Sequence, residues 1–263
     1  MFRFTIQMPI SEIAIVNKST LLSDANGQII VSALNMVLPK FCSDWNIPTV
    51  VAVYVPINRP TNVSIKIYLL DNSDVENALG YHDEINNIPY GKCFVNTVLQ
   101  NKGALLWNEN PRVQTFAQTV CHEIFEMIVD LYCNIWAMLA DKSTLYAYEV
   151  CDPVESNALT VSVQTVTSTV TKSRVPPFKN ITTTSVTYTN VGLSDWVLPE
   201  WFNPHATKGP FNHLNTLRAP FTLSPNGYVI SLTNGTVKTV FGDNVTEKSK
   251  EIILKKERLA KRT

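Results

Sequence analysis

The stretch Val120-Cys-His122-Glu123-Ile-Phe-Glu126-Met-Ile-Val-Asp130 places imidazole and carboxylate side chains inside an apolar pattern. Apolar residues recur at helical spacing around it and predict a helix over about 111–139: Val113, Phe116, Ala117, Val120, Ile124, Met127, Ile128 and Leu131. Residues four apart share one face of a helix, so His122 and Glu126 can reach the same point. Charged groups buried in such a helix need partners, because an unpaired buried charge costs several kcal/mol.

The chemistry of these side chains indicates a metal site. An imidazole nitrogen and a carboxylate oxygen are both zinc ligands, which assigns His122 and Glu126 as ligands. In an HExxH helix the second residue is the general base, so Glu123 is the candidate catalytic base. Here the second histidine is replaced by Glu126. The extra negative charge weakens the metal as a Lewis acid and makes calcium or manganese more acceptable.

Acidic residues that follow the helix could complete the ligand set. Glu149 and Asp152, in the segment Tyr148-Glu-Val-Cys-Asp-Pro-Val-Glu155, are the best candidates. We leave three residues open between ligand, supporting partner and no role: Asp130, His82 and Glu155. Zinc is the expected cofactor, with calcium or no metal as the alternatives.

Each of these assignments has a purely structural alternative. HExxE recurs by chance, and the alternative is a solvated helix face. For the 149–155 segment the alternative is a turn with a helix cap beside Pro153, and for His82 it is a loop residue bonded to the backbone. Cys121 and Cys151 are interpreted as buried, inert thiols rather than ligands, since nothing nearby obviously lowers their pKa. We assign no role to His205 or His213.

The N-terminal half alternates between helical and extended patterns, which favours an α+β fold. A helix is expected over 26–41 with Asp24 or Asn26 as its N-cap. Apolar or alternating runs predict strands over 50–55, 63–70 and 93–99, and the Gly80-Tyr-His-Asp83 stretch between the last two is interpreted as a polar loop.

The composition changes after Glu155. Residues 159–188 are dominated by Thr, Ser and Val at the strand period, and Pro176-Pro177 interrupts them. This predicts a long β-hairpin arm that a partner surface or the main body covers. Aromatic loops and a final strand follow. The last residues, 248–262, have the pattern of an amphipathic basic helix.

Composition limits the class of protein. The 263 residues carry 22 basic and 22 acidic side chains, and only 17% are charged against 45% hydrophobic. This excludes a wholly disordered chain and one that finds nucleic acid through bulk charge. No run approaches the roughly 18 apolar residues of a membrane helix, and the N-terminus does not have the pattern of a signal peptide. Five scattered cysteines indicate reduced thiols, and no membrane partner is expected.

Several motifs occur in an order that resembles a family of uncharacterised proteins encoded by bacteria, tailed phages and large DNA viruses. They are Gly80-Tyr-His-Asp83, His122-Glu-x-x-Glu126-Met-x-x-Asp130, Glu149-Val-x-Asp152-x-Val-Glu155, Ser194-Asp-Trp-Val-x-Pro-x-Trp-Phe202 and Asn226-Gly-Tyr228. The helix motif and the acidic stretch after it are also similar to the phosphate-induced EXORDIUM-like proteins. Both groups look like zincin-type metallopeptidases with an altered second ligand.

The resemblance implies a zincin-like α+β domain, a mixed sheet with an active-site helix, carrying an inserted β-hairpin arm and a C-terminal basic helix. The expected organisation is a zincin-like core (1–156), the arm (157–192), the C-terminal part of the core (193–245) and the basic tail (246–263). Three departures stand out: Cys121 replaces the family's serine, Leu131 replaces its proline, and the segment before Ser194 is much longer.

Two functions follow as expectations. The first is a zincin-like structural component of a viral particle or similar assembly, with a degenerate metal site, whose arm and basic tail contact other assembly proteins. The second is an active metal-dependent peptidase with a peptide substrate. The expected location is the virion or the host cytoplasm.

Overall fold

The largest sheet has five strands in the order β2-β1-β3-β5-β4. The computed structural model describes residues 10–172, 180–244 and 246. Its first five strands are β1 (Glu12–Asn17), β2 (Val51–Val55), β3 (Lys66–Leu70), β4 (Gly80–Ile85) and β5 (Ile88–Phe94). All neighbours in this sheet are parallel except β4, which pairs antiparallel with β5 along the edge. The α+β expectation is confirmed at the level of mixed sheets and few helices.

Strand β4 corrects the expectation that Gly80-Tyr-His-Asp83 is a loop. The strand turns directly into β5 through Asn86 and Asn87, whose φ values are 55° and 61°. Two successive positive φ angles match the turn type whose twist suits a two-residue hairpin, and asparagine tolerates them. The expected strand over 93–99 is also wrong in part, because β5 ends at Phe94 and α2 (Val95–Gln100) follows.

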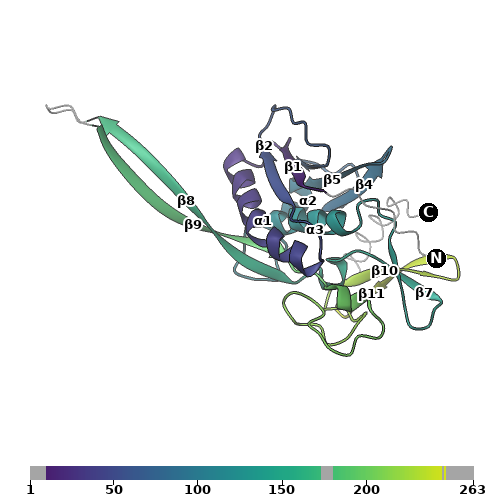
Figure 1. Ribbon diagram of the computed structural model, residues 1–263. Helices are drawn as coiled ribbons and strands as arrows, with labels where there is room; N and C mark the ends of the chain where they lie inside the picture. Colours follow the sequence, from purple (N-terminus) through teal and green to yellow (C-terminus); the bar gives the residue numbers. More distant parts are fainter. Residues whose placement is uncertain (1–9, 173–179, 245, 247–263) are drawn as a thin grey trace.

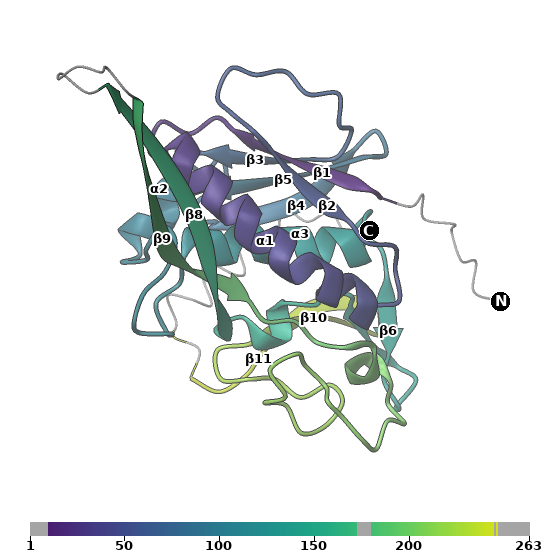
Figure 2. The ribbon, with the colours of Figure 1, turned by 60° about the vertical axis from the view of Figure 1, so that its left-hand side comes forward.

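Helices α1 (Asp24–Asp44) and α3 (Phe116–Val129) lie together on one face of this sheet (Figure 2). The N-cap of α1 is Ser23, whose hydroxyl accepts from the amide of Asn26. Helix α3 is much shorter than the helix expected over 111–139, and capping hydrogen bonds explain both of its ends. Thr115 accepts from the amide of Gln118 at the start, and Asp130 ends the helix by accepting from two later amides.

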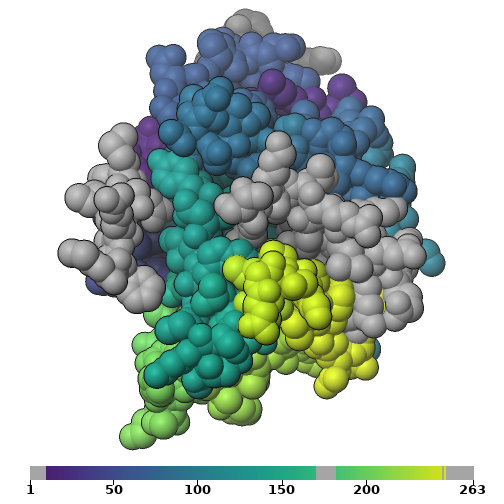
Figure 3. Space-filling model, turned by 90° about the vertical axis from the view of Figure 1, so that its right-hand side faces the viewer, coloured from purple at the N-terminus to yellow at the C-terminus, as the bar shows by residue number. Residues whose placement is uncertain are grey.

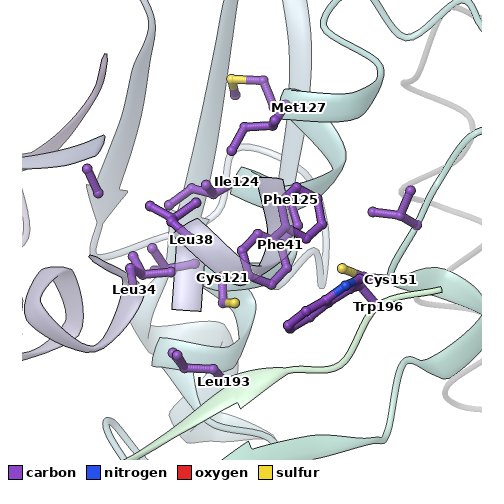
Figure 4. Packing of buried hydrophobic residues seen from close by; sticks show 14 of the residues in the cluster. Leu34, Leu38, Phe41, Cys121, Ile124, Phe125, Met127, Cys151, Leu193 and Trp196 are labelled. Atoms are coloured by element: carbon purple, nitrogen blue, oxygen red, sulfur yellow. The ribbon is translucent and has the colours of Figure 1, made fainter. Parts of the chain in front are cut away.

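Every residue of α3 is buried, because the helix packs against the sheet on one side and other chain segments on the other. Aromatic rings join the layers: Phe41 of α1 stacks on Phe125 of α3 with ring centroids 4.0 Å apart, and Trp196 meets Phe125 edge-on at 5.0 Å (Figure 4). These contacts add geometric specificity to the apolar burial. The core therefore fixes the position of α3.

A second, antiparallel sheet has the order β11-β10-β7-β6. Its strands are β6 (Trp136–Met138), β7 (Thr144–Ala147), β10 (Tyr228–Thr233) and β11 (Thr236–Phe241). Figure 3 shows the β10–β11 hairpin, in yellow, beside the teal β6–β7 segment. Short 3₁₀ helices η1 (Asp152–Val154) and η2 (Pro199–Phe202) follow β7 and β9.

The predicted hairpin is present as β8 (Ala158–Lys172) and β9 (Asn180–Ser194), a two-stranded ribbon that extends away from the body (Figure 1). Its base is buried, with Val163, Val191 and Leu193 at 5% exposure or less. The basic helix expected at the C-terminus lies outside the described residues, apart from Thr246. No helix in the described part of the chain is both long and apolar enough to span a bilayer.

Candidate metal centre

Helix α3 presents two side chains of the predicted motif to one point. His122 and Glu126 are one turn apart, and their Nε2 and Oε2 atoms are separated by 3.0 Å. Both side chains are buried, with exposed fractions of 4% and 1%. The other oxygen of Glu126, Oε1, accepts a hydrogen bond of 3.2 Å from the backbone amide of Cys151. That bond orients the carboxylate.

The η1 segment brings two more carboxylates to His122. Asp152 Oδ1 lies 3.2 Å from His122 Nε2, and Glu155 Oε2 lies 3.0 Å from His122 Nδ1. The carbonyl of Pro153 accepts from the amide of Ser224 at 2.9 Å, which ties η1 to the loop before β10. A Cβ atom at Gly227 would overlap this same carbonyl, so a glycine is required there.

Strand β4 brings His82 to the other side of the α3 carboxylates. Its Nδ1 lies 3.2 Å from Glu123 Oε2 and 3.8 Å from Glu126 Oε2. Its Nε2 lies 3.7 Å from Glu149 Oε2. Gly80, two residues earlier, lets the strand approach the helix, since a Cβ there would be 2.9 Å from Glu123 Oε1. The antiparallel edge strand thus places the imidazole.

The donor set fits a metal ion. Three groups of residues each offer ligand atoms within 4.8 Å of one another: His122 with Glu126 and Cys151, His82 with Glu126 and Glu149, and His122 with Asp152 and Glu155. Two ligands of a tetrahedral zinc site, each bonded at about 2.0–2.1 Å, are about 3.3 Å apart. Separations of 3.0–3.8 Å in the ion pairs are close to that spacing. These buried groupings could hold a metal ion.

Burial and neighbouring groups shift the pKa values of several side chains at this centre. Burial disfavours the imidazolium form of His82, but Cys133 and Glu123 outweigh it, so the pKa of His82 lies well above its ordinary value. Burial raises the pKa of the Cys121 and Cys151 thiols, which agrees with their interpretation as inert groups. All five cysteines are free thiols.

Other predicted candidates take different positions. The two Asp130 oxygens accept from the amides of Asn134 and Ile135 at 2.9 and 3.0 Å, so this residue caps the helix end and belongs to none of the three metal-ligand groups found among the described residues. Glu155, left open above, contacts His122, and His82, also left open, contacts Glu123, Glu126 and Glu149.

The sequence indicated the α3 pair through helical spacing alone, whereas His82 approaches only through the order of strands in the sheet. The signal that could have found it is its position in the Gly80-Tyr-His-Asp83 motif, if that stretch is taken as an edge strand. Comparison with protein-family models, with curated proteins and with solved structures finds no match, so the interpretation of this centre rests on its own geometry.

Proposed function

We propose that this protein is a zincin-like, metal-dependent hydrolase whose simplest substrate is a peptide. The observation that carries the proposal is the convergence on His122 Nε2 of Glu126 Oε2 at 3.0 Å and Asp152 Oδ1 at 3.2 Å. Imidazole and carboxylate together suit zinc, whereas calcium takes six to eight oxygen ligands. The zincin-like assignment is supported by an HExxE helix packed on a mixed sheet whose antiparallel edge strand borders the site.

Zinc bound at His122, Glu126 and Asp152 would supply a Lewis acid that polarises a carbonyl and lowers the pKa of water. Glu123 is the proposed base. Its carboxylate takes a proton from the attacking water as the new C–O bond forms, and returns it to the amine nitrogen as the C–N bond breaks. His82, 3.2 Å from Glu123 Oε2, holds that carboxylate in position. The burial of these side chains keeps bulk water away from them.

The test is peptide hydrolysis and metal content of the wild type and of Glu123→Gln. The isosteric amide cannot accept the proton, so hydrolysis should fall by about 10²–10⁴-fold while bound zinc is unchanged. Glu109→Gln, at an exposed carboxylate that belongs to none of the three metal-ligand groups found among the described residues, is the matched control and should behave as wild type. Equal hydrolysis by Glu123→Gln and wild type would refute the assignment of Glu123 as the base. Wild-type protein that binds no zinc would refute the assignment of the metal.

A second candidate function, a structural subunit of a viral particle or similar assembly, is favoured by the β8–β9 ribbon. On one face of the ribbon, near its middle, Val166 pairs directly with Val186, and Tyr188 lies beside them in register with Gln164. Their exposed fractions are 57%, 48% and 68%. A contiguous exposed apolar patch of this kind is typical of an interaction surface. The basic tail is the other proposed contact.

Mass measurement of the purified full chain in solution tests the second candidate. Self-assembly or co-purification with a defined assembly partner that is lost in the triple variant Val166→Thr, Val186→Thr and Tyr188→Thr would support it. Threonine keeps the strand propensity of the ribbon, so the comparison isolates the apolar contact. A monodisperse monomer at all concentrations, with the ribbon protected from proteolysis, would contradict it.

A further inference from the structure

We propose that the centre holds two divalent metal ions bridged by Glu126, rather than one. This inference rests on the proposed function and adds to it a second metal site built from His82 and Glu149. The first site consists of His122, Asp152 and Glu126. The same bridging carboxylate would then serve both ions, as in two-metal hydrolytic sites whose ions lie about 3.5–4 Å apart.

The ion pairs divide around the two histidines. Those of His82 are with Glu123, Glu126 and Glu149, and those of His122 are with Glu126, Asp152 and Glu155. Glu126 belongs to both sets, because its Oε2 is 3.0 Å from His122 Nε2 and 3.8 Å from His82 Nδ1. His82, Glu126 and Glu149 also offer one ligand atom each within 4.8 Å of one another. The geometry therefore describes two neighbouring donor groups joined at one carboxylate.

Each histidine is arranged as a ligand with its own supporting carboxylate. His122 Nδ1 lies 3.0 Å from Glu155 Oε2, and His82 Nδ1 lies 3.2 Å from Glu123 Oε2. A metal-binding histidine almost always donates its second ring N–H to such a group, which fixes the tautomer and leaves the other nitrogen to the ion. In both residues this leaves Nε2 as the ligand atom, toward Asp152 in one case and toward Glu149 in the other.

His82 provides independent evidence for a ligand. Its side chain is 4% exposed, yet Nε2 makes no hydrogen bond with any part of the chain that the structure describes. Glu149 Oε2 lies 3.7 Å from that nitrogen, which is too far for a hydrogen bond but suitable for two ligands of one ion. A buried polar nitrogen without a hydrogen bond is costly, and a cation would satisfy it.

The number of donors and their charge agree with two ions. One tetrahedral zinc ion takes four ligands. The cluster contains two imidazoles and the carboxylates of Glu123, Glu126, Glu149, Asp152 and Glu155. When all five carboxylates are ionised, one divalent cation leaves a net charge of about −3 and two leave about −1, which is far less costly to bury.

The experiment measures zinc bound per chain in the untagged, full-length protein after loading and exhaustive dialysis, by elemental analysis. The wild type should bind two ions, and His82→Ala should bind one. Glu149→Gln, which keeps the volume of the side chain, should also bind only one ion. It serves as the test variant if His82→Ala proves unstable. His205→Ala, at an exposed histidine, is the control and should keep both ions.

Cobalt titration followed by visible absorption provides a second readout, because two sites give a two-step spectral change and His82→Ala should show one step. Wild type that binds one ion, or His82→Ala and Glu149→Gln that both keep two, would overturn the two-metal inference. The first of these results leaves the proposed hydrolase intact. Wild type that binds no metal would overturn the proposed function as well.

Discussion

Gly80→Ala should damage the candidate site through a steric effect that the structure defines closely. The new Cβ atom would lie 2.9 Å from Glu123 Oε1 and 2.9 Å from Thr119 Cγ2. Ordinary contacts between such atoms are about 3.5–4.0 Å, so strand β4 and helix α3 must separate locally or the two side chains must shift. Overpacking of this kind costs about 1–3 kcal/mol. For a chain of this size that corresponds to a decrease in Tm of roughly 2–12 °C.

The assay combines unfolding of the metal-free protein with zinc titration. Because His82 lies two residues after Gly80 on β4, displacement of the strand should also weaken zinc binding. Gly192→Ala is the matched control, since its Cβ would meet nothing closer than 3.4 Å and its backbone accepts an L side chain. If Gly80→Ala and Gly192→Ala unfold at the same temperature and bind zinc equally, the close approach of β4 to α3 is not as described.

Three further perturbations test the core around the site. Trp196→Ala should lower the free energy of unfolding by about 3–5 kcal/mol in urea, since the ring is fully buried among Phe41, Phe125 and His213, and a loss below about 1 kcal/mol would contradict that packing. Asp195→Ala should lower the free energy of unfolding by about 3 kcal/mol in the same measurement, because four donors lose their acceptor, among them the buried amide of Trp196 and Asn212 Nδ2. An unchanged free energy of unfolding would refute these hydrogen bonds. Burial lowers the pKa of His213 below 6.5, so the unfolded state takes up the proton first as the pH falls. The free energy of unfolding should therefore decrease as the pH drops below about 6.5 through the folded-state pKa. His213→Phe should abolish this decrease, and an unchanged pH dependence would show that another group causes it.

Features that depend on local pattern could be predicted from the sequence. The apolar spacing within 26–41 defined most of α1, and the alternation of Thr and Val defined the β8–β9 hairpin. The ends of α3 could not be predicted in this way. Apolar residues continue on both sides of the helix, and the boundaries depend on hydrogen bonds from Thr115 and Asp130.

The residues of the candidate site also differ in whether local pattern could place them. The shared face of His122 and Glu126 follows from helical geometry, which operates over one turn. The approach of Asp152 depends on a chain reversal through the second sheet, and that of His82 depends on an edge strand pairing antiparallel with β5. Such contacts are set by tertiary packing, so residue type could suggest these side chains as partners but could not place them.

The length of the β8–β9 ribbon gives the molecule a long reach. Each strand has 15 residues, and at about 3.3 Å per residue the ribbon is about 50 Å long. A globular body of about 210 residues has a radius of gyration of about 17 Å, hence a breadth of a little over 40 Å. Because the base is buried as far as Val163, about nine residues of each strand project, and the far end lies about 30 Å beyond the surface of the body. A force or a binding event at that end would act on α1 and α3 through a long lever, at the layer that carries His122 and Glu126.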